Sequence, residues 1–134
     1  MAELRERRYQ PSTSICFYTD KPKRREIFAA SFRDRIVHHL VYAALAPAWE
    51  RVFIHHSYAC RPNKGTHAAA SALQKVLHQI TANGTLPAHF LKLDLHNFFM
   101  SIDRRLLFDM LAAACNDDAL LWLLRVLVFH VQRD

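Results

Sequence analysis

The stretch "HFLKLDLHNFFMSID", residues 89–103, places a single carboxylate, that of Asp94, inside an apolar run that alternates like a β-strand. Its apolar neighbours are Phe90, Leu91, Leu93 and Leu95. Burying an unpaired carboxylate among such neighbours is costly, so something has to compensate for the charge. A divalent cation does so, because Mg²⁺ takes one or two carboxylates together with substrate phosphates and keeps several waters. The alternative is an ordinary aspartate that faces solvent at a strand end or pairs with an arginine.

The composition is that of one small domain with a basic N-terminal part. The chain has 134 residues, 51% of them hydrophobic, and a formal net charge of +6. Residues 1–35 hold nine Lys or Arg against five Asp or Glu, whereas residues 36–134 hold nine against seven. A polyanion such as nucleic acid is therefore the first partner to consider, although a solvated surface has a similar balance.

The cysteines indicate a reducing compartment. Cys16, Cys60 and Cys115 are odd in number and far apart, which fits neither a disulfide framework nor a zinc site. The charged N-terminus does not resemble a signal peptide, and no apolar run approaches the roughly 20 residues of a membrane span. We therefore expect a cytoplasmic protein that does not contact a membrane.

The pattern along the chain predicts a helix-rich α+β fold. The chain has two glycines, which disfavours an all-β sandwich. Residues 14–30 are typical of a β-hairpin with a basic tip, and residues 89–95 of a strand. Helical periodicity predicts four helices: from Phe32 to an interruption at Pro47, from Thr66 to Asn83 with Gly84 as its stop, after a cap at Ser101 or Asp103, and over 119–131.

Three blocks of the sequence resemble the reverse transcriptases of group II introns, retrons and diversity-generating retroelements. "LKLDLHNFFMSID" is similar to their first palm motif, in which an apolar strand ends in Asp and an aromatic residue and Ser-Ile-Asp follow. "RREIFAASFRDRIVHHLV" resembles their fingers segment through Arg25, Asp34 and Arg35, and "FIHHSYACRPNKGTHAA" resembles the next block. The last two are closer to the diversity-generating retroelement type, because the intron type more often has Pro where Ala30 stands.

The resemblance implies part of a right-hand polymerase. Residues 1–88 would be the fingers region, including the hairpin over 14–30, and residues 89–134 the start of the palm. The family's second catalytic motif, an aromatic residue, any residue and two aspartates, is absent from the sequence. Asp117 and Asp118 lack the preceding aromatic and are better explained as helix caps. We therefore expect a fragment or truncated reading frame that is inactive alone.

The resemblance also implies roles for single residues at the metal and sugar. Asp94 matches the first catalytic aspartate, which binds Mg²⁺ (or Mn²⁺), and the backbone carbonyl of Leu95 would be a further metal ligand. In such enzymes the metals stabilise the attacking hydroxyl and the leaving pyrophosphate. Phe99 matches the aromatic that lies under the sugar and excludes a 2′-hydroxyl, and its alternative is an ordinary core phenylalanine. We expect its neighbour Phe98 to lie in the core.

Basic residues would contact the substrates. Arg25 matches the fingers residue that binds the triphosphate, with Lys23 as a lesser candidate, because the planar guanidinium grips phosphate oxygens. Arg61 and Lys64 would line the path of template or nucleotide, unless they belong to a plain surface loop. Asp34 and Arg35 would be structural and tie the hairpin to the following helix. The implied partners are an RNA template, a DNA primer, a deoxynucleoside triphosphate, and either an accessory protein or a missing C-terminal part.

Two other classes of function stay open. The chain could be a non-catalytic nucleic-acid-binding module derived from a reverse transcriptase. It could also be a helical interaction protein whose apolar C-terminal helix docks on a partner. Salt dependence separates them, because binding through phosphate contacts falls steeply with salt.

Overall fold

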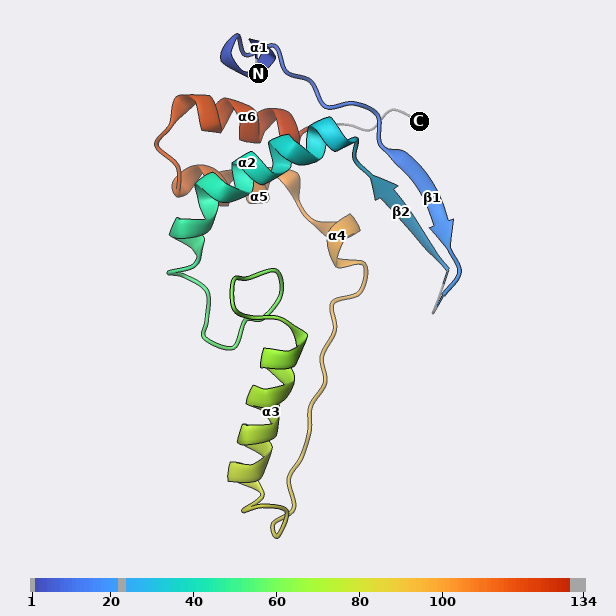
Figure 1. Cartoon of the computed structure of the whole chain (residues 1–134), viewed down its shortest axis with the longest axis vertical. Helices are drawn as coiled ribbons and strands as arrows, with labels where there is room; N and C mark the ends of the chain where they lie inside the picture. The colour runs from blue at the N-terminus through green and yellow to red at the C-terminus, as the bar shows by residue number, and fades with distance from the viewer. Residues whose placement is uncertain (1, 22–23, 131–134) are drawn as a thin grey trace. The chain divides into compact units, whose positions relative to one another are not determined.

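The computed structural model describes residues 2–21 and 24–130 and has an α+β fold (Figure 1). The described residues form six helices and one two-stranded antiparallel sheet, which confirms the helix-rich α+β class. In chain order the elements are α1 (Ala2–Arg5), β1 (Ile15–Thr19), β2 (Arg25–Ala29), α2 (Phe32–Trp49), α3 (Thr66–Ile80), α4 (Phe98–Ser101), α5 (Arg104–Ala113) and α6 (Asp118–Val128). They fall into two compact units, which are described separately below.

The predicted β-hairpin is confirmed. Strands β1 and β2 pair with Phe17 opposite Ile27 and with Tyr18 opposite Glu26. Two cross-strand contacts support this register: the Tyr18 hydroxyl donates to the Glu26 carboxylate over 3.2 Å, and the Arg24 guanidinium lies 4.8 Å from the centre of the Tyr18 ring. The hairpin therefore projects basic and aromatic side chains together near its tip.

The hydrophobic core lies in the first unit, which comprises the described residues of Met1–Glu50 and Phe99–Asp134. Val37, Val41 and Leu45 recur every four residues on α2 and pack with Leu123 and Leu124 of α6. Figure 1 shows α2 beside α6, and α5 packs against α6. Partly buried residues complete this core: Leu4, Trp49, Phe108, Leu111, Leu120, Trp122, Val126 and Leu127. The α6 helix thus uses its apolar face inside its own unit.

A buried carboxylate joins the N-terminal segment to the start of α2. Asp34 is 1% exposed, and it accepts hydrogen bonds from the Tyr9 hydroxyl (2.7 Å), the Ser12 backbone N–H (2.8 Å) and the Ser31 hydroxyl (2.8 Å). Ser31 is also the N-cap of α2, and its side chain accepts from the Asp34 backbone N–H. The guanidinium of Arg33 lies 3.6 Å from Asp34 and over the Tyr9 ring. Asp34 therefore fastens the hairpin's two flanks to one helix end, as expected for this residue, whereas Arg35 lies over the Phe32 ring of the same helix.

The ends of the helices follow local capping rules. Asp103 caps α5 by accepting from the backbone N–H groups of Arg105 (2.8 Å) and Leu106 (3.0 Å), and these bonds lower the pKa of its carboxyl. Asp117 caps α6 in the same way through Leu120 (2.8 Å), which confirms the prediction. The prediction that Pro47 interrupts α2 was wrong, because the helix continues to Trp49. Pro47 lies in the last turn, so its missing N–H removes the bond to the carbonyl of Ala43, and the helix ends two residues later.

The second unit, Arg51–Phe98, has no buried hydrophobic side chain. It contains α3, which ends at Ile80 rather than Asn83, and a turn in which Gly84 adopts a φ of 89°. The predicted strand over 89–95 is absent, since these residues have no regular secondary structure (Figure 1). A lone strand has no partner for its backbone groups, and β1 and β2 make the only sheet in the described residues. The alternating pattern was present, but pairing decides whether a strand forms.

Two expectations from composition can be compared with the structure. Cys16 and Cys60 are exposed free cysteines, and Cys115 is a buried free cysteine. Within residues 2–21 and 24–130, no helix has the length and apolar character needed to cross a bilayer.

Replacing Asp34 by Asn should destabilise the first unit. The amide keeps the shape of the side chain but turns one acceptor oxygen into a donor, so buried donors lose their partner. We expect the free energy of unfolding in urea to fall by about 2–4 kcal/mol at neutral pH. Asp109→Asn on the exposed surface of α5 is the matched control and should change stability by less than about 0.5 kcal/mol. Equal stability of the two variants would contradict the role assigned to Asp34.

The same carboxylate should make stability depend on acid pH. Burial alone raises the pKa of Asp34, but hydrogen bonds from Tyr9, Ser12 and Ser31 outweigh burial and lower it from 3.8 to about 2. The ionised form therefore stabilises the fold, fully above about pH 4, and this stabilisation is lost as the pH falls toward about 2. It amounts to about 2 kcal/mol. Urea unfolding between these pH values should show a shallower decline for Asp34→Asn than for the wild type, whereas parallel declines would refute the assignment.

Candidate functional site

The predicted site residues belong to two units. Arg25 and Phe99 lie in the first unit, whereas Asp94 and Leu95 lie in the second. The structure describes each unit by itself, so the expected approach of Arg25 to Asp94 stays a prediction. The unit boundaries, after Glu50 and Phe98, also differ from the predicted division of the chain into 1–88 and 89–134. The assignment of these regions to fingers and palm stays a prediction as well.

Asp94 lies in an exposed, irregular segment rather than at the end of a buried strand. Its neighbours Phe90, Leu91, Leu93 and Leu95 are 71–82% exposed. The cost of burying the carboxylate, which motivated a bound cation, therefore does not arise in the chain as described. It would arise only if another strand and another layer covered this segment.

The described residues do not by themselves form a magnesium site. Mg²⁺ takes six ligands in near-octahedral geometry, usually one or two carboxylates with phosphates and water. By the resemblance, Asp94 and the carbonyl of Leu95 would supply two of these, and the described residues contain no group of three or more His, Cys, Asp or Glu placed to hold a metal. The same two ligands would be too few to hold Mn²⁺. Asp94 can thus be one ligand of a metal whose remaining ligands lie elsewhere.

The hairpin presents Arg25 for an anionic ligand. Arg25 is exposed at the first position of β2, opposite Thr19, and its guanidinium has no hydrogen bond or ion pair with a described residue. Its neighbour Arg24 lies instead over the Tyr18 ring. Lys23, the lesser candidate, lies outside the described residues. Of the basic residues predicted to bind the triphosphate, Arg25 is the one whose environment can be assessed, and its charge is available.

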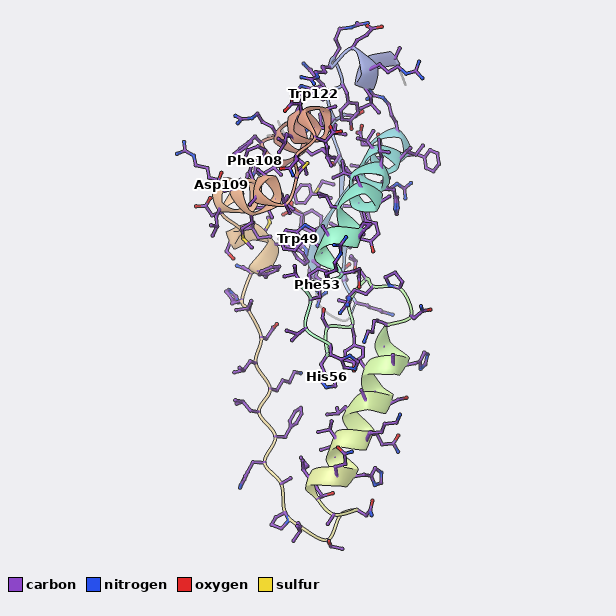
Figure 2. All side chains as sticks on the ribbon, turned by 90° about the vertical axis from the view of Figure 1, so that its left-hand side faces the viewer. Trp49, Phe53, His56, Phe108, Asp109 and Trp122 are labelled. Atoms are coloured by element: carbon purple, nitrogen blue, oxygen red, sulfur yellow. The ribbon has the colours of Figure 1, made fainter. Side chains whose placement is uncertain are left out.

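Arg61 and Lys64 organise the loop that precedes α3. Arg61 donates to the backbone carbonyls of Ile54 (3.1 Å) and Ser57 (3.0 Å), and its guanidinium lies 5.1 Å from the centre of the Phe53 ring. Lys64 donates to the carbonyl of His55 over 3.0 Å. Figure 2 marks the positions of Phe53 and His56 in this loop. Both basic residues therefore have a structural task, and a contact with template or nucleotide stays a prediction.

Phe98 and Phe99 stand on the short helix α4. Phe99 is 85% exposed, which fits a residue that meets a ligand better than it fits the alternative of a core phenylalanine. Phe98, the predicted core residue, is 48% exposed, so that prediction was wrong for the chain as described.

The first unit also has a basic and aromatic surface that was not predicted from the sequence. A cleft of about 340 Å³ is lined by Arg7, Arg8 and Tyr9 of the N-terminal segment and by Trp122 and His130 from the region of α6. Trp122 is labelled in Figure 2, as is Phe108 of α5. Arg8 is paired with Glu6. The excess of Lys and Arg in residues 1–35 was the available signal, but their convergence on α6 depends on the fold.

Comparison with known proteins finds a similar protein in Escherichia coli. No protein-family model matches the chain. The chain is 30% identical over 125 residues to protein YkfC of Escherichia coli (strain K12), and the match covers 91% of the chain but 32% of YkfC. The chain therefore spans about a third of the length of this relative.

Arg61→Ala should loosen the loop over 51–65 without unfolding the first unit. Its bonds to the carbonyls of Ile54 and Ser57 and its contact with the Phe53 ring are lost together, which lowers the local stability of the loop. Hydrogen exchange followed by mass spectrometry should show faster exchange in peptides from this loop and unchanged exchange in α2 and α6. Lys75→Ala, on the exposed side of α3, is the control and should leave the loop unchanged. Unchanged exchange in Arg61→Ala would show that the loop does not depend on it.

Proposed function

We propose that these residues are the fingers region and the beginning of the palm of an RNA-directed DNA polymerase, a reverse transcriptase. The observation that carries the proposal is the hairpin from 15 to 29 with Arg25 exposed on it, fastened through Asp34 to α2. The resemblance assigned Arg25 to substrate and Asp34 to structure. The contacts support these two roles. Arg25 is exposed and its charge is available to a ligand, whereas Asp34 is buried and its carboxylate accepts hydrogen bonds from neighbouring residues.

In the proposed enzyme, Arg25 holds the triphosphate of the incoming deoxynucleotide. A guanidinium presents parallel N–H donors that match two phosphate oxygens, and it stays charged at any physiological pH. Its position on a strand limits its motion more than a loop would. The pairing of β1 with β2 therefore fixes the direction from which the charge approaches the phosphates.

Asp94 supplies one carboxylate and Leu95 one carbonyl to a magnesium ion. When bound, the metal would stabilise the attacking hydroxyl and the leaving group of phosphoryl transfer. The other carboxylates would come from residues outside these 134, because the described residues hold no set that completes the site. Phe99, which is exposed on α4, would lie under the sugar and select against a 2′-hydroxyl.

A second candidate is a nucleic-acid-binding module without catalysis. The basic cleft lined by Arg7, Arg8, Trp122 and His130 favours it, since cationic and aromatic side chains together suit a single strand. The third reading, in which α6 docks on a partner, loses support. Leu123 and Leu124 of α6 are buried against α2.

Primer extension by a protein in which residues 1–134 are completed by the rest of a palm tests the proposal. We expect magnesium-dependent DNA synthesis on an RNA template, and Asp94→Asn should reduce it by about a thousandfold or more, because a metal contributes several kcal/mol to such a transition state. RNA binding by the variant should be retained. Asp109→Asn on α5 is the control and should synthesise like the wild type. Synthesis that survives Asp94→Asn would refute the metal role, and RNA binding without synthesis by the wild type would favour the second candidate.

A further inference from the structure

A further cleft of the first unit lies between α5 and α6 and carries two arginines beside two phenylalanines. It measures about 420 Å³ and is lined by Arg105, Phe108, Asp109, Arg125 and Phe129. Both helices belong to the same unit, so the cleft is formed within it. Phe108 and Asp109 are labelled in Figure 2. We propose that this α5–α6 cleft binds one nucleotide, with its phosphate on the two arginines and its base against the Phe129 ring.

Helical spacing brings the lining side chains together. On α5, Phe108 and Asp109 follow Arg105 by three and four residues, which places all three on one side of the helix. On α6, Phe129 follows Arg125 by four residues and is the C-cap of the helix. The ring centres of Phe108 and Phe129 are 5.6 Å apart, so the two helices meet through these rings. Each helix therefore contributes one arginine and one aromatic ring to the same cleft.

Arg125 is positioned by a contact that leaves its hydrogen-bond donors available. Its guanidinium lies 4.9 Å from the centre of the Phe108 ring. A guanidinium has five N–H donors, and attraction to a ring does not satisfy them as an anion does. The side chain of Arg125 forms no hydrogen bond or ion pair with another described residue. It can therefore meet a phosphate with its planar donors already held near the cleft.

Arg105 adds a second positive charge that the described part of the chain does not neutralise. Its guanidinium is exposed and has no hydrogen bond or ion pair with a described residue. Asp109 also lines the cleft, and within the described residues it is not ion-paired with Arg105. The lining thus carries two positive charges against one negative charge, which favours an anion. A phosphate suits two arginines because its oxygens can accept charge-assisted hydrogen bonds from both.

The aromatic rings favour a nucleotide over a bare anion. Phe129 is 37% exposed, so part of its ring is available beside the arginines. Bases stack on aromatic side chains, and arginine adds cation–π attraction to such sites. The volume of the cleft also falls in the range of small-ligand pockets. A phosphate joined to a base would use the charges and the ring together, whereas inorganic phosphate would use the charges alone.

This inference goes beyond the proposed polymerase function and does not rest on it. The cleft contains neither Asp94 nor Arg25, and binding a monophosphate there needs no metal. A free nucleotide and one nucleotide of a single strand offer the same phosphate and base, so both chemistries fit the cleft. Binding here and DNA synthesis can therefore fail separately.

NMR titration of the nitrogen-15-labelled chain in EDTA, without magnesium, tests the site. Adenosine monophosphate should shift backbone amide signals of α5 and α6 around the cleft. Inorganic phosphate and adenosine should each bind about fivefold more weakly, because each offers half of the ligand. A single-stranded tetra-adenylate that shifts the same signals and binds about tenfold more tightly than the monophosphate would identify a strand as the source. Equal affinities would identify a free nucleotide.

Variants of the lining residues localise the binding. Arg105→Gln and Phe129→Leu should each weaken binding of adenosine monophosphate by about fivefold, since one removes a charged donor and the other the ring. Asp109→Asn, on the same helix and in the same cleft, is the matched control and should bind at least as tightly as the wild type, because it removes a negative charge. Arg105→Gln decides the matter if Phe129→Leu loosens the end of α6.

Three results would overturn the proposal. The first is the absence of shifts around the cleft. The second is unchanged binding in Arg105→Gln, which would place the nucleotide elsewhere. The third is equal affinity for inorganic phosphate and adenosine monophosphate, which would indicate an adventitious ion only.

Discussion

The buried carboxylate of Asp34 is the interaction on which the first unit depends. It gathers donors from three places in the chain, Tyr9, Ser12 and Ser31, at the end of α2 where the hairpin begins. An ionised carboxylate withdrawn from water is tolerated only when several donors replace the lost hydration. Burial, together with the bond to Asp34, raises the pKa of the Tyr9 phenol, so this residue remains a donor at neutral pH. Removing the charge would release the N-terminal segment and the root of the hairpin together.

The parts of the fold that local rules govern could be predicted from the sequence. The hairpin followed from two β-prone runs around a turn, and the caps at Asp103 and Asp117 from their position before apolar helices. The bond from Tyr9 to Asp34 spans 25 residues and belongs to no periodic pattern, so only the tertiary structure reveals it. The prediction of a strand at 89–95 was wrong for the opposite reason. Its pattern was clear, but a strand needs a partner that the described residues do not provide.

The sequence predicted which residues belong to the candidate site. The fold places only some of them where a ligand could meet them. Arg25 and Phe99 are exposed where a ligand could meet them, and Asp94 is exposed with one neighbouring carbonyl. Arg61 and Lys64 illustrate a limit of motif reasoning, because a basic residue can be required by a loop's own carbonyl groups.

The most direct measurement is magnesium-dependent primer extension with residues 1–134 and, in parallel, with a longer protein in which these residues are completed by the rest of a palm. The account predicts synthesis by the longer protein and none by residues 1–134, because Asp94 and Leu95 offer too few ligands for the metal. Robust synthesis by residues 1–134 alone would contradict the view that they hold half of a site. Absence of synthesis by the longer protein would contradict the polymerase assignment itself.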